Sequence, residues 1–128
     1  MNFQGSILLV DDEPHIRKYV SLILRQLGTP RLIEAGNGVE AISAYRRENP
    51  DLILLDVNMP IMDGIETLKK LKEIAPECIV VMLTSLANRQ TIEQAIELGA
   101  ANYIRKDTSR EEIAKALAET IDACFETE

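Results

Sequence analysis

Cysteine and tryptophan are scarce in this sequence, and their scarcity narrows the kinds of site that the chain can build. Tryptophan is absent, and the two cysteines, Cys78 and Cys124, do not form a CxxC pair. Both cysteines lie among apolar residues. We therefore expect two small buried side chains in a reducing compartment, which argues against a disulfide or a cysteine-bound metal.

Long hydrophobic runs are missing as well. No apolar run approaches the ~20 residues needed to span a bilayer, and no signal peptide is visible. We expect a cytoplasmic protein without membrane contact. The opening residues, 1–5, look like the remnant of a protease-cleaved tag, so we expect a tag remnant or a disordered N-terminus there.

Positive charge is in the minority. Lysine and arginine number 14 against 21 acidic residues, which gives a formal net charge of −7. An acidic surface repels phosphate backbones, so this domain is not expected to bind nucleic acid directly. The length of 128 residues suits one globular domain, and 46% hydrophobic residues are enough to form a core.

Short apolar runs predict the strands of a sheet. Residues 7–10, 52–55 and 79–83 are continuous apolar runs that end abruptly at polar residues. Runs of this length suit strands buried on both faces, as in a parallel sheet. The shorter runs at 32–33 and 103–104 are weaker candidates.

Apolar residues recur at helical spacing between these runs. The first expected helix has one apolar face at residues 16, 20, 23 and 27, with Pro14 in its first turn and Gly28 as its stop. Further helices are expected over 39–45, 65–71, 92–96 and 113–124. Alternating strands and helices predict an α/β fold: a single doubly wound, five-stranded parallel sheet with five helices on its two faces.

Polar residues whose side chains can take part in chemistry follow these strands. Asp11 and Asp12 follow the first strand, Asp56 the third, Thr84 the fourth and Lys106 the fifth. Open α/β sheets bind ligands outside the carboxyl ends of their strands. We therefore expect these five side chains to converge at one edge of the sheet.

The types of these side chains indicate phosphoryl transfer. Three carboxylates in one crevice repel each other unless a cation joins them, and Mg²⁺ prefers oxygen ligands. Lys106 adds a compact positive charge and Thr84 a hydroxyl group. A metal ion and a lysine together neutralise the charge that develops on a transferring phosphoryl group.

Four motifs in order carry a resemblance to a known family: LVDDE at 9–13, LLDVNMPIMDG at 54–64, LTS at 83–85 and YIRK at 103–106. With them, the sequence resembles the CheY-like receiver domain of bacterial two-component response regulators over about residues 6–125. The resemblance implies a flavodoxin-like sheet with strand order 2-1-3-4-5.

The resemblance also implies roles for the site residues. Asp56 would accept the phosphoryl group, and Lys106 would pair with its oxygens. Asp12 and Asp56 would bind Mg²⁺ directly, and Asp11 would bind it through water or support it. The metal would also contact the backbone carbonyl of Asn58.

A switch and its partners follow from the same resemblance. Thr84 would move to the phosphoryl group, the backbone of Ser85 would help to hold that group, and Tyr103 would turn inward. The phosphodonor would be a sensor histidine kinase or a phosphotransfer protein, and a downstream effector or output domain would read the surface of the fourth helix, fifth strand and fifth helix. Phosphorylation could produce a homodimer.

Such a domain is a signalling switch rather than an enzyme with a separate substrate. It would catalyse its own phosphorylation and its own dephosphorylation, and Asn58 and Leu86 would set the rate of the second step. His15, the only histidine, is expected to be an exposed contact for the partner kinase.

One position departs from the family pattern. Receivers commonly have a proline straight after the lysine, often in a cis bond, whereas Asp107 follows Lys106 here. We therefore expect no cis peptide at this position. The Lys-Asp pair resembles receivers from regulators with a helix-turn-helix output domain, which favours a receiver taken from a longer protein.

Three alternatives belong to other classes. The first is a degenerate receiver that only binds partners. The second is a phosphohydrolase of the haloacid dehalogenase type, which needs a second aspartate two residues after the first, where Asn58 stands here. The third is a flavodoxin-like FMN carrier, disfavoured because tryptophan and a Ser/Thr-rich loop after the first strand are absent.

Overall fold

The computed structural model describes residues 2–125 of the chain, and these form five successive β–α units. The strands are β1 (Ser6–Val10), β2 (Arg31–Ala35), β3 (Leu52–Leu55), β4 (Val80–Thr84) and β5 (Asn102–Arg105). The helices are α1 (Pro14–Leu24), α2 (Gly38–Glu48), α3 (Gly64–Ile74), α4 (Arg89–Glu97) and α5 (Arg110–Cys124).

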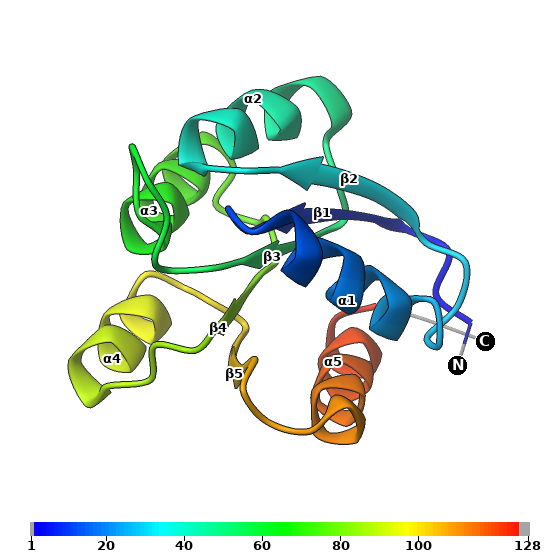
Figure 1. Ribbon diagram of the computed structural model, residues 1–128. Coiled ribbons are helices and arrows are strands. Elements are labelled where there is room, and N and C mark those ends of the chain that lie inside the picture. The colour runs from blue at the N-terminus through cyan, green and yellow to red at the C-terminus, as the bar shows by residue number, and fades with distance from the viewer. Residues whose placement is uncertain (1, 126–128) are drawn as a thin grey trace.

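All five strands are parallel and lie in the order β2-β1-β3-β4-β5, which confirms the predicted fold class (Figure 1). Val10 at the end of β1 pairs with Leu55 at the end of β3. Because these two strands end in register, the residues after them leave the sheet side by side.

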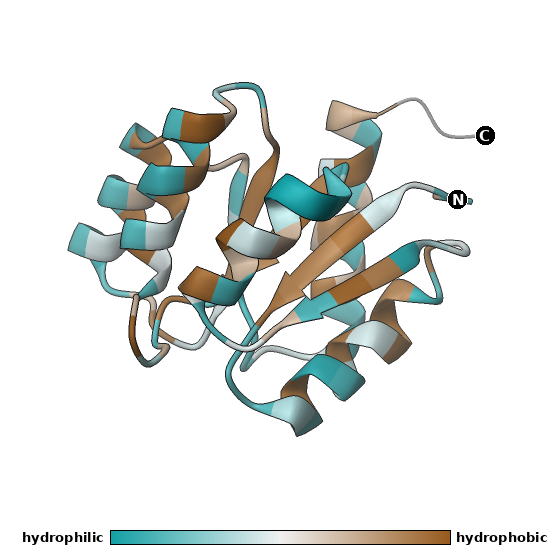
Figure 2. Cartoon of the chain, turned by 90° about the horizontal axis from the view of Figure 1, so that it is seen from above, coloured by the Kyte–Doolittle hydropathy of each residue, from teal (hydrophilic) through white to brown (hydrophobic). Residues whose placement is uncertain are grey.

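Two apolar layers enclose the sheet, one on each face. Alternate strand residues point to opposite faces, so Leu8 and Val10 join the core under α2, α3 and α4, whereas Ile7 and Leu9 join the core under α1 and α5. Figure 2 shows the strands as hydrophobic bands between helices with hydrophilic outer faces. Burial on both faces explains the continuous apolar runs.

The helix that follows the third strand begins at a defined cap. The side chain of Asp63 accepts a hydrogen bond from the backbone N–H of Glu66 at 2.9 Å. This cap satisfies a donor that the first turn of a helix leaves free. It fixes the start of α3 after a loop of eight residues, 56–63, which lies beside the carboxyl edge of the sheet.

The N-terminal segment departs from the expectation of disorder. Phe3 is buried, with 4% of its surface exposed, and its backbone N–H donates to the carbonyl of Leu27 at 2.8 Å. Its ring lies 5.3 Å from that of Phe125, centroid to centroid. The apolar ring of Phe3 fills the end of the core, which explains why this segment is packed.

The predicted end of the first helix is wrong. The helix stops at Leu24, and Gly28 lies four residues later with a φ of 147°. A Cβ atom at position 28 would lie 2.2 Å from the carbonyl oxygen of Phe3. Gly28 therefore serves the close approach of the N-terminal segment rather than the end of the helix.

The two cysteines differ in their environment. Cys78 is a free, buried thiol, as expected, whereas Cys124 is free and exposed, so the expectation of burial is wrong for Cys124. The last buried residue of α5 is Ile121, and Cys124 lies beyond it in the final turn.

Among the described residues, no helix is both long and apolar enough to cross a membrane.

Candidate functional site

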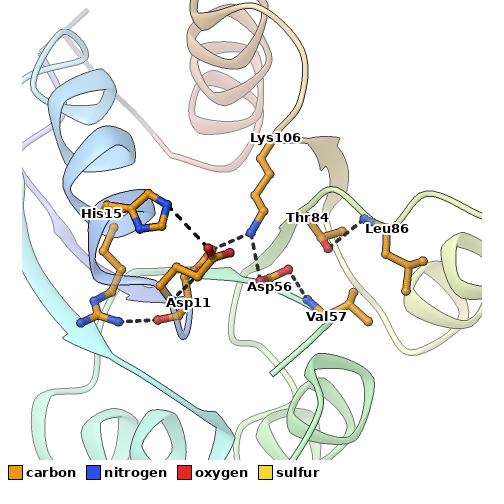
Figure 3. Close-up of polar contacts among 9 residues, drawn as sticks. Asp11, His15, Asp56, Val57, Thr84, Leu86 and Lys106 are labelled. Atoms are coloured by element: carbon orange, nitrogen blue, oxygen red, sulfur yellow. Dashed lines mark hydrogen bonds and ion pairs between the residues drawn. The ribbon is translucent and has the colours of Figure 1, made fainter. Parts of the chain in front are cut away.

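The carboxyl ends of β1 and β3 bring two aspartates together. The backbone N–H of Asp56 donates to the carbonyl of Val10 at 3.0 Å, and the N–H of Asp11 donates to the carbonyl of Ala35 at 3.1 Å. Both bonds extend the pairing of the sheet by one residue. Asp11 and Asp56 thus emerge from neighbouring strands with their carboxylates on the same side (Figure 3).

Three carboxylates form one acidic cluster at this edge. One carboxylate oxygen from each of Asp11, Asp12 and Asp56 lies within 4.8 Å of the other two. Asp11 and Asp56 are only 3% and 4% exposed, whereas Asp12 faces solvent. Backbone N–H groups also hold the two buried carboxylates: Glu13 donates to Asp11 at 2.9 Å and Val57 to Asp56 at 2.8 Å.

Lys106 joins the two buried carboxylates. Its Nζ donates to Asp11 Oδ2 at 2.9 Å and to Asp56 Oδ2 at 3.0 Å, and its side chain is 12% exposed (Figure 3). Burial alone would lower the pKa of Lys106, but the hydrogen bonds to Asp11 and Asp56 outweigh it and raise the pKa above its usual value. The site therefore contains a fixed cation directly beside Asp56.

The donor atoms of the cluster suit a hard divalent cation. Asp11, Asp12 and Asp56 offer carboxylate oxygens that lie close together. An all-oxygen set with one solvent-facing ligand is typical of Mg²⁺ sites, which keep several waters. These three carboxylates could hold a metal, and the carbonyl of Asn58 as a further ligand stays a prediction.

A second group of residues connects β4 with β5 through one backbone unit. The N–H of Leu86 donates to Thr84 Oγ1 at 3.2 Å, and the carbonyl of Leu86 accepts the hydroxyl of Tyr103. Thr84 is fully buried and Tyr103 is half-buried. Two of the three residues expected to form the switch, Thr84 and Tyr103, thus share Leu86 as their partner, which the sequence did not indicate.

The same surroundings perturb Tyr103. Burial raises the pKa of its hydroxyl, and the negative charge of Asp56 raises it further. Tyr103 therefore remains neutral and a hydrogen-bond donor over the whole physiological range. Ser85, the third expected switch residue, is exposed directly after β4.

A pocket of about 430 Å³ adjoins the site between α3 and α4. Asn58 and Leu86 both line it. These are the two residues that the resemblance links to the rate of dephosphorylation, and the structure places them on the wall of one opening.

Two residues outside the predicted set shape the site. A guanidinium N–H of Arg17 donates to the main-chain carbonyl of Asp11. Gly64 begins α3 directly against the backbone of Asp56, and a Cβ atom there would lie 2.0 Å from the carbonyl oxygen of Asp56. Gly64 ends the motif at 54–64, so the sequence could have indicated it, whereas nothing in the sequence connects Arg17 with Asp11.

The position that departs from the family pattern has a partner of its own. Asp107 accepts two hydrogen bonds from the guanidinium of Arg105, at 3.0 and 2.8 Å. These bonds hold the pKa of Asp107 below its usual value. The described residues contain no cis peptide bond, so the bond between Lys106 and Asp107 is trans. His15 is exposed on α1, with Nε2 3.5 Å from a carboxylate oxygen of Glu13.

Known proteins share both the sequence pattern and the fold. Residues 7–118 match the response regulator receiver domain family. The chemotaxis protein CheY of Bacillus subtilis (strain 168) is 33% identical over 116 residues, which cover 91% of this chain and 97% of that protein. The nitrate/nitrite response regulator NarL of Escherichia coli (strain K12) is 37% identical over 114 residues, 88% of this chain and 53% of that protein.

A solved structure agrees with this relationship. CheY of Borrelia burgdorferi, crystallised as a CheX-CheY-BeF3-Mg complex, superposes with a TM-score of 0.86 at 28% identity, over 91% of this chain and 89% of that one. The fold and the acidic edge define a CheY-like α/β domain. The chain belongs to the response regulator receiver domain family and is therefore a receiver of two-component signalling.

Proposed function

We propose that this receiver is activated by transfer of a phosphoryl group to Asp56. The observation that carries the proposal is the contact of Lys106 Nζ with both Asp56 and Asp11, while Asp12 completes the cluster within 4.8 Å. A cation fixed beside one buried carboxylate is what an incoming phosphoryl group requires. The phosphodonor is a phosphohistidine of a sensor kinase or of a phosphotransfer protein.

The transfer is a displacement at phosphorus. A carboxylate oxygen of Asp56 forms a bond to phosphorus while the bond from phosphorus to the donor nitrogen breaks, and the imidazole leaves with the electron pair. Lys106 neutralises charge on the equatorial oxygens. Asp11, Asp12, Asp56 and the carbonyl of Asn58 would hold Mg²⁺, which would supply the remaining positive charge. The Mg²⁺ in the Borrelia burgdorferi CheY complex supports this assignment.

The response begins at the corner of β4. Thr84 Oγ1 now accepts a hydrogen bond from the Leu86 N–H at 3.2 Å. An added phosphoryl oxygen can accept the hydroxyl proton of Thr84, and the side chain must rotate away from Leu86 to donate it. When Thr84 turns toward Asp56, Leu86 is released and Tyr103 packs inward. Ser85 donates its backbone N–H to the phosphoryl group. The change is a shift between two existing populations, and its size is limited by the contacts that differ between them.

The surface formed by α4, β5 and α5 reports this shift to a downstream effector or an output domain, with a homodimer as one form of the active state. Water then attacks phosphorus, orthophosphate leaves, and the carboxylate of Asp56 is restored. Asn58 and Leu86 control this step because both line the opening beside the site. The switch operates in the cytoplasm, where its kinase partner supplies the phosphoryl group.

Intact-mass spectrometry with acetyl phosphate and Mg²⁺ tests the proposal. The wild type is expected to gain the mass of one phosphoryl group, and Asp56→Asn none. Asp107→Asn, which alters an exposed acid near the site, is the matched control and should gain it as the wild type does. Equal uptake by Asp56→Asn rules out Asp56 as acceptor, and no uptake from small donors or a kinase favours a receiver that only binds partners.

A further inference from the structure

A groove between α2 and α3 is not used by the proposed switch. The two helices lie side by side on one face of the sheet (Figure 1), and the groove between them has a volume of about 810 Å³. Apolar side chains from both helices and from the loop before α3 line it: Val39, Ile42, Met62 and Ile74. Val39 and Ile74 are 49% and 38% exposed, which leaves apolar surface in contact with solvent.

The charged residues of this groove are mostly positive, opposite to the net charge of the whole protein. Three cations, Arg46, Arg47 and Lys70, line it with a single acid, Glu73, although the whole chain carries a net charge of −7. Arg47 is paired with Glu48 at 3.2 Å. Within residues 2–125, neither Arg46 nor Lys70 forms a hydrogen bond or an ion pair, so two cations are available to an outside partner.

We propose that this groove, the α2–α3 groove, docks an acidic amphipathic helix of a partner protein. Apolar residues of that helix would cover the exposed Val39 and Ile74, and its carboxylates would pair with Arg46 and Lys70. Helices that bind grooves use apolar anchors at one face. Each wall of the groove is an 11-residue helix, about 16 Å long, so three turns of a partner helix fit along it.

The charges favour this occupant over a second copy of the chain. A symmetric dimer through the groove would bring the same patch of both copies together. Arg46 and Lys70 would then face their own counterparts, and like charges across an interface are costly. An acidic partner has no such penalty, and the local cations also draw it toward this part of an otherwise repulsive surface.

The groove lies away from the surface of α4, β5 and α5, yet it contacts the loop that follows Asp56. Met62 belongs to that loop and lines the groove. Its side chain abuts the start of α2 so closely that a Cβ atom on Gly38 would lie 3.0 Å from Met62 Sδ. The proposed docking surface is thus a second one, next to the loop that follows the phosphorylation site.

Fluorescence anisotropy with a synthetic probe tests the proposal. The probe is a labelled amphipathic peptide of about four helical turns with leucines on one face and glutamates on the other. A second peptide with lysines in place of the glutamates is the control. We expect the acidic peptide to bind the full chain, and the basic peptide to bind at least about tenfold more weakly.

Variants of the protein locate the contact. The double variant Arg46→Glu with Lys70→Glu should weaken binding of the acidic peptide by about tenfold or more. Val39→Ser should weaken the binding without any change of charge. Lys115→Glu on α5 changes charge by the same kind of substitution outside the groove and should bind as the wild type does. All substitutions are at exposed positions, and unchanged thermal unfolding verifies the fold.

Four results would overturn the proposal. The first is failure of the acidic peptide to bind, and the second is equal binding by the wild type and the double variant. The third is amide chemical-shift changes that map outside α2 and α3 when the peptide is added. The fourth is a wild-type dimer in sedimentation that the double variant abolishes, which would assign the groove to a second copy of the chain.

Discussion

The acidic cluster of Asp11, Asp12 and Asp56 is held differently from the corner after β4, which consists of Thr84, Leu86 and Tyr103. In the cluster, Lys106 binds two carboxylates at 2.9 and 3.0 Å, and backbone N–H groups hold the same carboxylates from behind. At the corner, Thr84 and Tyr103 each depend on one bond to the backbone of Leu86. The cluster is held by more bonds than the corner, and we infer that the corner can change its arrangement more easily.

This difference assigns phosphorylation to the cluster and the conformational response to the corner. Several bonds to each buried carboxylate fix the place where a phosphoryl group would arrive, since pre-organised charge needs no rearrangement during the reaction. A single neutral hydrogen bond contributes about 1 kcal/mol, so a new bond of similar strength can replace it. Substitutions in the cluster should therefore stop phosphorylation, and substitutions at the corner should leave phosphorylation in place but silence the response.

Lys106→Met should have the largest effect. Loss of its charge removes the cation that stabilises the transferred group, so phosphorylation by acetyl phosphate should slow by roughly 10²–10³-fold. The rate is measured by intact mass over time, with Lys115→Met as the control. An unchanged rate in Lys106→Met would mean that the cluster is only structural.

Asp12→Asn should have the next largest effect, and on the metal rather than on the acceptor. Asp12 is the exposed member of the cluster, so its loss removes one ligand without disturbing the bonds to Lys106. The Mg²⁺ concentration needed for half-maximal phosphorylation should rise by about tenfold or more. Glu13→Gln, a neighbouring exposed acid, should leave the Mg²⁺ dependence unaltered; an equal rise in both variants would point to general charge instead of ligation.

Thr84→Val sharpens the comparison from the side of the corner. Valine keeps the shape but leaves the Leu86 N–H without its acceptor, which should cost about 1 kcal/mol in urea unfolding. Phosphorylation should continue at a similar rate, while the amide chemical-shift changes across α4, β5 and α5 on phosphorylation should disappear. If those changes persist in full, Thr84 does not transmit the signal.

The smallest effect is expected on the loss of folding stability at alkaline pH. The pKa of Tyr103 is raised above its ordinary value of 10.0, first by burial and then by Asp56. The unfolded chain therefore ionises Tyr103 at lower pH than the folded chain does, and stability falls as pH rises past 10.0. Urea unfolding should show a shallower alkaline decline in Tyr103→Phe than in the wild type; parallel declines would contradict this assignment.

The contrast between cluster and corner also explains what the sequence could predict. Asp11, Asp56 and Lys106 were predictable because parallel strands end at a common edge, which brings distant residues together without knowledge of side-chain conformation. The strand order and the individual roles required the family resemblance. Leu86 as the shared partner of Thr84 and Tyr103 was not predictable, because it depends on the path of one loop.

Long-range packing was also hidden from the sequence. Phe3 looked like part of a tag remnant, yet it covers the end of one core and pairs with residues beside Gly28. Arg17 reaches back to the carbonyl of Asp11 from within α1. Arg46 and Lys70 lie far apart in the sequence, and only the packing of α2 on α3 brings them to one groove.

The central claim is that Asp56, and no other residue, carries the phosphoryl group. Borohydride reduction of the phosphorylated protein, followed by peptide mass spectrometry, tests it directly because borohydride converts an aspartyl phosphate to homoserine. We predict homoserine at position 56 alone, dependent on Mg²⁺. Reduction at Asp11 or Asp12 instead, or a phosphoryl group found on His15 with Asp56 unchanged, would contradict the account.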